Sequence, residues 1–308
     1  MRLFVIGNGF DIDHGLKSKF KDFKEFLEQT YVLTFNREYV AFPNVGMGKD
    51  GEEVVDSNSA SQILYALINE VSDDSDWRDF EDCLGELNYQ EVLDLVDEDE
   101  ENPFHYNYNL QDTTKDLRTS LLFVISNIFS EWAEGIDIST TEAKYTFLED
   151  DLFLTFNYTS VLEDIYGIPK DSICHLHGSS IEHFCITGHG NDKRSFNDYD
   201  DIISFEINNI HDCLRKNVET IYKNNYSFFK KIYYSNITEI VFFGFSFGQA
   251  DLYYIKQLFN NINTNDTKIF LSTYEDKNEK NIKLKTIKLL GFNGKYFGAF
   301  DKRTKDVK

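Results

Sequence analysis

The sequence lacks the features that would place it in a metal-ribbon or membrane class. None of its four cysteines, Cys83, Cys174, Cys185 and Cys213, belongs to a C-x-x-C pair, so a structural zinc ribbon has no support. No run of about 18 apolar residues occurs, and the start MRLFVIGNGFD has no basic region before an apolar signal core. We expect a cytoplasmic protein with core thiols, no metal and no membrane contact.

Basic residues are also few. There are 31 Lys and Arg against 53 Asp and Glu, a net charge of −22. This field repels nucleic acids and anionic membranes, so non-specific nucleic acid binding is not expected. An anionic nucleotide would need local donors. We expect Asp73–Asp76 and Asp94–Glu101 to be solvated, and Glu81 to be an exposed carboxylate on a helix that begins at Trp77.

What the sequence does contain is a strand–helix rhythm in a chain with 41% hydrophobic residues. At 308 residues we predict one α/β domain over residues 1–308, with a mostly parallel sheet flanked by helices and a mainly helical insertion over 32–150. The predicted strands are Leu3–Ile6, Asp151–Phe156, Ser172–Leu176, His183–Thr187, Glu239–Phe243 and Lys268–Ser272. The predicted helices are Lys19–Tyr31 with Ser18 as N-cap, Ala60–Val71, Trp77–Leu87, Thr113–Trp132, Ala250–Asn261 and Asn278–Leu290, with a further helical zone over 205–235.

A glycine turn follows the first strand. Gly7-Asn8-Gly9 would let the backbone approach a phosphate, whose charge the following amides can meet. The third glycine of the dinucleotide fingerprint is missing, because position 12 is Ile. The alternative is a tight strand-to-helix turn. Asp11 would contact a ribose or cap the next turn.

An Asn and several His residues lie near two later strand ends. The amide of Asn157 would orient a water or a sugar hydroxyl, unless Asn157 is simply a turn residue. His177, before Gly178, is expected to be exposed enough to act as a base near neutral pH. His175 would share its strand face if the pairing stays regular, so it competes for this role, as does His189.

A further candidate segment begins at Gly244, directly after the predicted strand Glu239–Phe243. Ser246 and nearby amides would hold a phosphate or ribose, and Asp251 is a further candidate for binding the nucleotide, although an Asp in this place more often stabilises a helix N-terminus. Because sites in parallel sheets collect at the strands' carboxyl ends, we expect the four strand ends to form one site.

These pieces together resemble a known family. The ordered set FVIGNGFDIDHGLKSKFKDF, WRDFE, LTFNYTSVLE, HLHG, TGHG and GFSFGQADLYY resembles the AbiH family of bacteriophage abortive-infection proteins, from residue 2 to about residue 255. That family is similar to sirtuin-like domains, whose motifs match Gly7–Asp11, Phe156-Asn157-Tyr158, His177-Gly178 and Gly244–Ser246 in pattern. The resemblance implies a Rossmann-like, NAD-binding fold with a helical module inserted.

The resemblance also implies a function. The chain would be an antiphage effector that hydrolyses the nicotinamide–ribose bond of NAD, with Asn157 orienting the reactants and His177 as general base. The glycine turn would line the diphosphate, and Ser246 would contact the far ribose or phosphate. Asn8 and Asp11 replace the small residues of sirtuin turns, which alters the pocket near the diphosphate or ribose. Without a zinc ribbon or a recognisable acetyl-lysine channel, protein deacetylation is disfavoured.

Two other functions stay open. The protein could be a nucleotide-binding sensor without catalysis, signalling through a partner on region 32–150, or a toxin-like nuclease, which the acidic charge disfavours. The ligand could be NAD, NADP or a related nucleotide. A lethal hydrolase also requires control, for which we expect a phage-derived trigger or partner protein, or assembly into a homo-oligomer.

Overall fold

The computed structural model describes residues 1–32, 42–68, 77–87, 89, 96, 103–191, 201–272 and 277–300. The chain divides into two compact units. The first comprises Met1–Ser18, Ala133–Cys185 and Asn217–Lys308, and the second comprises Lys19–Trp132 and Ile186–Lys216. The expected single domain over 1–308 with an insertion over 32–150 stays a prediction, because this division describes how the chain is packed and not which parts fold alone.

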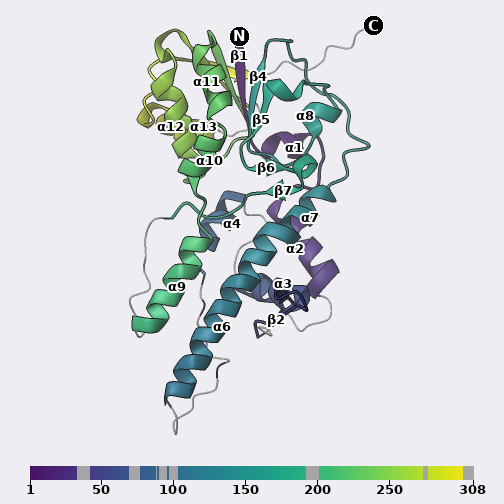
Figure 1. Cartoon of the computed structure of the whole chain (residues 1–308). Coiled ribbons are helices and arrows are strands. Elements are labelled where there is room, and N and C mark those ends of the chain that lie inside the picture. Colours follow the sequence, from purple (N-terminus) through teal and green to yellow (C-terminus); the bar gives the residue numbers. More distant parts are fainter. Residues whose placement is uncertain are drawn as a thin grey trace. The chain divides into compact units, whose positions relative to one another are not determined.

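The first unit contains a six-stranded sheet in which every neighbouring pair is parallel, with the order β10-β9-β8-β1-β4-β5 (Figure 1). Its strands are β1 Arg2–Ile6, β4 Leu152–Thr155, β5 Ile173–His175, β8 Glu239–Phe243, β9 Lys268–Ser272 and β10 Lys295–Phe300. Counted in chain order, the strands lie as 3-2-1-4-5-6, the order of Rossmann folds. The predicted α/β fold with a Rossmann-like parallel sheet is therefore confirmed.

Continuous apolar runs form the central strands because both faces of the sheet are covered. All five residues of β1 are buried, and so are Ile240–Phe243 of β8. Phe4 stacks on Phe153 of the neighbouring strand at a ring distance of 5.2 Å. Arg2, at the start of β1, donates from Nε to Asp151 Oδ1 at 2.8 Å in a buried ion pair.

Helices flank this sheet, with α11 and α12 on one side of the strands and α1 and α8 on the other in Figure 1. Their bounds are α1 Gly9–Asp13, α8 Val161–Asp164, α10 Val218–Asn224, α11 Tyr226–Tyr234, α12 Leu252–Asn261 and α13 Lys277–Leu289. The short 3₁₀ turns are η3 Lys170–Ser172, η4 Ser180–Glu182 and η5 Thr264–Asp266.

Two strand predictions need correction. The predicted strand His183–Thr187 is only the two-residue β7 Phe184–Cys185, which pairs antiparallel with β6 Gly178–Ser179 outside the main sheet. His183 has a left-handed backbone (φ 55°), so the extended run begins only after it. The strand β10 was not predicted, because its exposed, glycine-interrupted sequence lacks the apolar run of the central strands.

The second unit is mainly helical. It includes α2 Phe20–Leu27, α3 Ser57–Leu67, α4 Trp77–Leu84, α6 Pro103–Phe123 and α9 Asp201–Cys213, the π-helical turns η1 Glu28–Val32 and η2 Val124–Ile128, and the hairpin β2 Val45–Met47 with β3 Glu53–Val55. The helix α7 Phe129–Glu134 follows η2. Buried aromatic rings form the core of the second unit. Phe20 stacks on Phe80 at a ring distance of 4.9 Å, and Phe23 meets Phe129 edge-on at 5.3 Å.

Several details differ from the sequence predictions. Lys19 and not Ser18 is the N-cap of α2, and its N–H donates to Asp22 Oδ2 at 2.7 Å. Cys174 and Cys185 are buried and Cys83 is half-buried, but Cys213 is exposed and is no core thiol. The segment Asp73–Asp76 lies outside the described residues, as does Asp94–Glu101 apart from residue 96. Within the described part of the chain, no helix is both long and apolar enough to cross a membrane.

Candidate functional site

Four predicted site positions lie at one edge of the sheet. Gly7 directly follows β1 and Gly244 directly follows β8, while Asn157 and His177 each come two residues after β4 and β5. Because β8, β1, β4 and β5 are parallel neighbours, their carboxyl ends meet at the same edge. The structure therefore brings these positions to one edge, while their roles in binding or catalysis stay predictions.

The glycine turn packs tightly against the turn after β8. The Gly7 N–H donates to Phe243 O and the Gly9 N–H to Gly244 O, both at 3.0 Å. A Cβ on Gly9 would lie 2.6 Å from the Gly244 Cα, so only glycines allow this approach. Asn8 is also engaged, since its Nδ2 donates to Ser18 O at 2.8 Å. The amide donors of Gly7 and Gly9 are thus used inside the protein, and a phosphate would need other donors.

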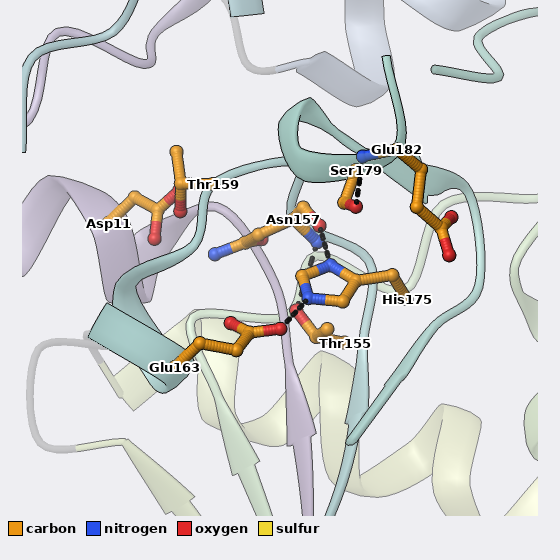
Figure 2. Close-up of polar contacts among 8 residues, drawn as sticks. All are labelled: Asp11, Thr155, Asn157, Thr159, Glu163, His175, Ser179 and Glu182. Atoms are coloured by element: carbon orange, nitrogen blue, oxygen red, sulfur yellow. Dashed lines mark hydrogen bonds and ion pairs between the residues drawn. The ribbon is translucent and has the colours of Figure 1, made fainter. Parts of the chain in front are cut away.

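Asp11 lies within α1 and not at its cap. Its carboxylate is buried and accepts a hydrogen bond from Thr159 Oγ1 at 2.8 Å (Figure 2). Burial raises the pKa of Asp11 to about 6, although Thr159, the Asn157 amide and the charge of His175 act to lower it. A carboxyl group with this pKa changes its charge close to neutral pH.

Asn157 has a buried side chain that points toward Asp11 and Thr159 (Figure 2). The Asn157 backbone N–H donates to Thr155 Oγ1 at 3.1 Å, and its carbonyl accepts from His175 Nδ1 at 3.0 Å. Its Nδ2 is enclosed and makes no hydrogen bond of ordinary length among the described residues; the nearest acceptor is the Asp11 carboxyl group, whose pKa the Asn157 amide helps to lower. An unsatisfied buried amide costs free energy, so this group is suited to bind an oxygen atom of a ligand or water.

His175 and Glu163 form a pair beside Asn157. His175 Nε2 lies 2.9 Å from Glu163 Oε1, and the two side chains are 10% and 12% exposed. Burial acts to lower the pKa of His175, but the hydrogen bond and charge of Glu163, with the Asn157 carbonyl, outweigh it and raise the pKa. Glu163 was not singled out from the sequence; the signal for it is a carboxylate six residues after Asn157 on the following short helix.

His177 is buried, with 2% exposure, so the expectation of an exposed imidazole was wrong. β5 ends at His175, so regular pairing stops there and the two imidazoles meet different partners. His177 Nε2 lies 3.4 Å from Asp251 Oδ1, and its ring meets Phe156 edge-on at 5.2 Å. Asp251 is the N-cap of α12, as predicted, but its side chain makes no capping bond and faces His177 instead.

The remaining residue of the predicted nucleotide site is Ser246. It is half-buried between Phe245 and Phe247, both buried. Phe247 has a left-handed backbone (φ 60°), and its ring packs on Phe242 at 4.9 Å. These aromatic anchors fix the turn that carries Ser246.

His189 lies in the second unit and is fully buried. Its Nε2 donates to His211 O at 2.8 Å, and its Nδ1 accepts from the Asn191 N–H at 3.1 Å. Burial lowers the pKa of His189 to about 4, so the ring is neutral and both of its nitrogens are used. In the same unit Glu81 is paired with the buried Lys216 and is not the exposed carboxylate that was expected.

A pocket of about 540 Å³ lies along the edge strand β5. We call it the edge pocket; its lining comprises Glu163, Lys170, Asp171, Ile173, Cys174, His175, Ser179, Ile181, Glu182, Asn225, Ser227, Phe228 and Lys231. His175 and Glu163 therefore form part of its wall, next to Asn157. Within the described ranges, no group of three or more His, Cys, Asp or Glu residues could hold a metal ion.

Comparison with known proteins gives one match. The family model described as "Bacteriophage abortive infection AbiH" matches residues 3–273. The search of curated proteins and the search of solved structures each found no match.

Proposed function

Because the chain belongs to the AbiH family of bacteriophage abortive infection proteins, we propose that it is an antiphage effector that binds NAD and hydrolyses the bond between nicotinamide and ribose. The observation that supports this most is the buried Asn157 amide, whose Nδ2 faces the Asp11 carboxyl group without a hydrogen bond of ordinary length among the described residues, at the carboxyl edge of a sheet with Rossmann strand order. Such an edge is where open α/β sheets bind ligands.

In this proposal Asn157 acts on the ribose. Breaking the glycosidic bond builds positive charge on the ribose ring, so hydroxyl groups and the attacking water must be held in place. The Asn157 Nδ2 would donate to a ribose hydroxyl oxygen. The amide is already fixed by its neighbours, because the backbone of Asn157 is hydrogen-bonded to Thr155 and to His175. Little ordering would then remain to be done when the substrate binds.

His177 would be the general base, with Asp251 supporting it. A carboxylate 3.4 Å from an imidazole nitrogen orients the ring and stabilises the positive charge that forms when the ring takes a proton. Base catalysis of this kind contributes about 10²–10⁴-fold.

The charge distribution opposes an anionic ligand much less in the first unit than in the second. That unit has 19 basic and 21 acidic residues, a formal charge of −2, whereas the second has 12 and 32, a formal charge of −20. The edge pocket is lined by Lys170 and Lys231, which would meet a diphosphate, but also by Glu163, Asp171 and Glu182, and neither Asn157 nor His177 is part of its lining. Its volume of about 540 Å³ is within the usual range of ligand pockets, roughly 300–1,000 Å³.

The test is chromatography of NAD with purified wild type and His177→Ala, with His105→Ala as the matched control because His105 is exposed on α6 in the second unit. Nicotinamide and ADP-ribose should appear with wild type and with His105→Ala, and not with His177→Ala. Equal turnover by all three proteins would remove His177 from the mechanism. NADP in a parallel series identifies the preferred nucleotide.

The burial of His177 also favours a second function, a nucleotide sensor without catalysis. Calorimetric titration of the same three proteins separates the two: a sensor binds NAD and forms no product with any variant. A phage-derived trigger or partner, or self-association, is proposed as the control of either activity. Repeating the assay with phage-infected lysate distinguishes a sensor from an enzyme that awaits its trigger.

A further inference from the structure

His175 is held between two acceptors. Its Nε2 faces Glu163 Oε1 at 2.9 Å, and its Nδ1 faces the Asn157 carbonyl oxygen at 3.0 Å (Figure 2). A carbonyl oxygen only accepts hydrogen bonds, and so does an ionised carboxylate, so both ring nitrogens must donate. This requires a doubly protonated imidazolium. A neutral ring would have to give up one of the two bonds, unless the Glu163 carboxyl group carried the proton and donated it to Nε2.

We propose that His175 is a positioning residue. It is a permanently charged imidazolium whose contacts with Glu163 and the Asn157 carbonyl, which we call the clamp, hold the turn at Asn157 so that the Asn157 side-chain amide stays directed at the substrate. The identity of the substrate in this inference rests on the proposed function. The inference also excludes His175 as the general base, because a ring whose two nitrogens both donate cannot accept a proton.

The surroundings of His175 fit a retained charge. Glu163 on α8 neutralises it at close range, and Glu182 on η4 and Asp11 on α1 interact with it at longer range. Lys170, Asp171 and Lys231 line the edge pocket together with His175. Because the His175 side chain is 10% exposed, solvent screens the Glu163 contact only weakly.

The clamp restricts the backbone at Asn157. The hydrogen bond from His175 to the Asn157 carbonyl and the hydrogen bond from the Asn157 N–H to Thr155 fix the peptide groups on both sides of Asn157. With one of these lost, the turn gains freedom and the buried amide is no longer held in a single place. A misplacement of about 1 Å at a reacting group costs on the order of 10²-fold in rate.

The decisive experiment is nitrogen NMR of histidine- and asparagine-labelled protein, with His175→Gln to assign the ring signal. In wild type we expect both ring nitrogens protonated at neutral pH, above the ordinary histidine pKa of about 6.5. In Glu163→Met, whose side chain has similar length but cannot donate to a neutral ring, the ring should titrate near the ordinary value, and the Asn157 side-chain amide signal should shift over the same pH range. Asp164→Asn, which removes the neighbouring exposed carboxylate on α8, should behave as wild type.

The matching activity experiment compares the pH profiles of the same proteins with NAD. At pH 8 Glu163→Met should lose about 10–100-fold in kcat with little change in NAD affinity. At pH 6 it should approach wild type, because the ring is then charged without Glu163. Rescue by Glu163→Asp at pH 8 would support the clamp.

The outcomes separate the two proposals. If the protein does not hydrolyse NAD, the proposed function fails, and the NMR titration still decides the clamp. A wild-type His175 that titrates with an ordinary pKa, or an Asn157 amide signal that does not change in Glu163→Met, would overturn it. A Glu163→Met loss of activity that is equal at pH 6 and pH 8 would also contradict it.

Discussion

The packing of Gly244 against the glycine turn after β1 can be tested by adding one methyl group. Gly244 has φ 62°, and a Cβ there would lie against Gly9 Cα and Phe10 N, well inside van der Waals contact. Gly167 has nearly the same backbone angle, φ 65°, and a Cβ there would meet nothing within 4 Å. Gly244→Ala and Gly167→Ala therefore share the backbone strain and differ in the clash.

The expected magnitudes follow from these two contributions. A left-handed backbone costs an L-residue about 1–2 kcal/mol, and both variants lose this amount. Forcing a methyl group into a packed site costs about 1–3 kcal/mol more, and only Gly244→Ala loses this. Gly244→Ala should thus lose about 2–5 kcal/mol, a large part of the roughly 5–15 kcal/mol that stabilises an ordinary domain.

The assay is urea unfolding followed by far-UV circular dichroism, with wild type and both variants under one condition. The difference between the two variants should be about 1–3 kcal/mol. Equal losses for Gly244→Ala and Gly167→Ala would show that the two turns are not packed together, and the glycine turn would again be available to cradle a phosphate.

Three further predictions concern buried charges. Burial raises the pKa of Asp11 to about 6, so the folded protein keeps a proton that the unfolded chain loses near pH 4. The free energy of unfolding should therefore fall as the pH rises from 4 to 6. Asp11→Asn should remove about 1–3 kcal/mol of that fall, measured as unfolding free energy at pH 4.5 and 7. Burial lowers the pKa of His189 to about 4, so stability should fall as the pH drops from about 6.5 to about 4, and this slope should flatten in His189→Gln. Lys216→Met leaves Glu81 buried without its partner and should cost about 3–5 kcal/mol, whereas the double variant Glu81→Leu/Lys216→Met should lose much less in the same unfolding assay.

The sequence predicted the sheet well where strands are continuous apolar runs. β8 and β9 have the predicted bounds, Glu239–Phe243 and Lys268–Ser272. β8 is buried on both faces and β9 is buried on one face and partly on the other, so their apolar composition identifies them. β10 was missed, because its side chains are mostly exposed and it is held by pairing with β9, which no local pattern shows.

The sequence predicted where the candidate site residues lie in the sheet, but not which side chains they contact. Parallel topology brings Asn157 and His177 to one edge once the strand ends are known. The sequence could not show that His177 is buried against Asp251, or that His175 faces Glu163, since each pair joins separate segments whose distance depends on tertiary packing. Nor could it show that the glycine turn packs against a second turn.

The most direct test of the central claim is to incubate NAD with wild type and with Asn157→Ala, after checking that both unfold at the same urea concentration, and to measure nicotinamide and ADP-ribose by chromatography. The account predicts both products with wild type and neither with Asn157→Ala. Equal product formation by the two proteins would contradict it, because the buried amide of Asn157 would then have no part in the reaction.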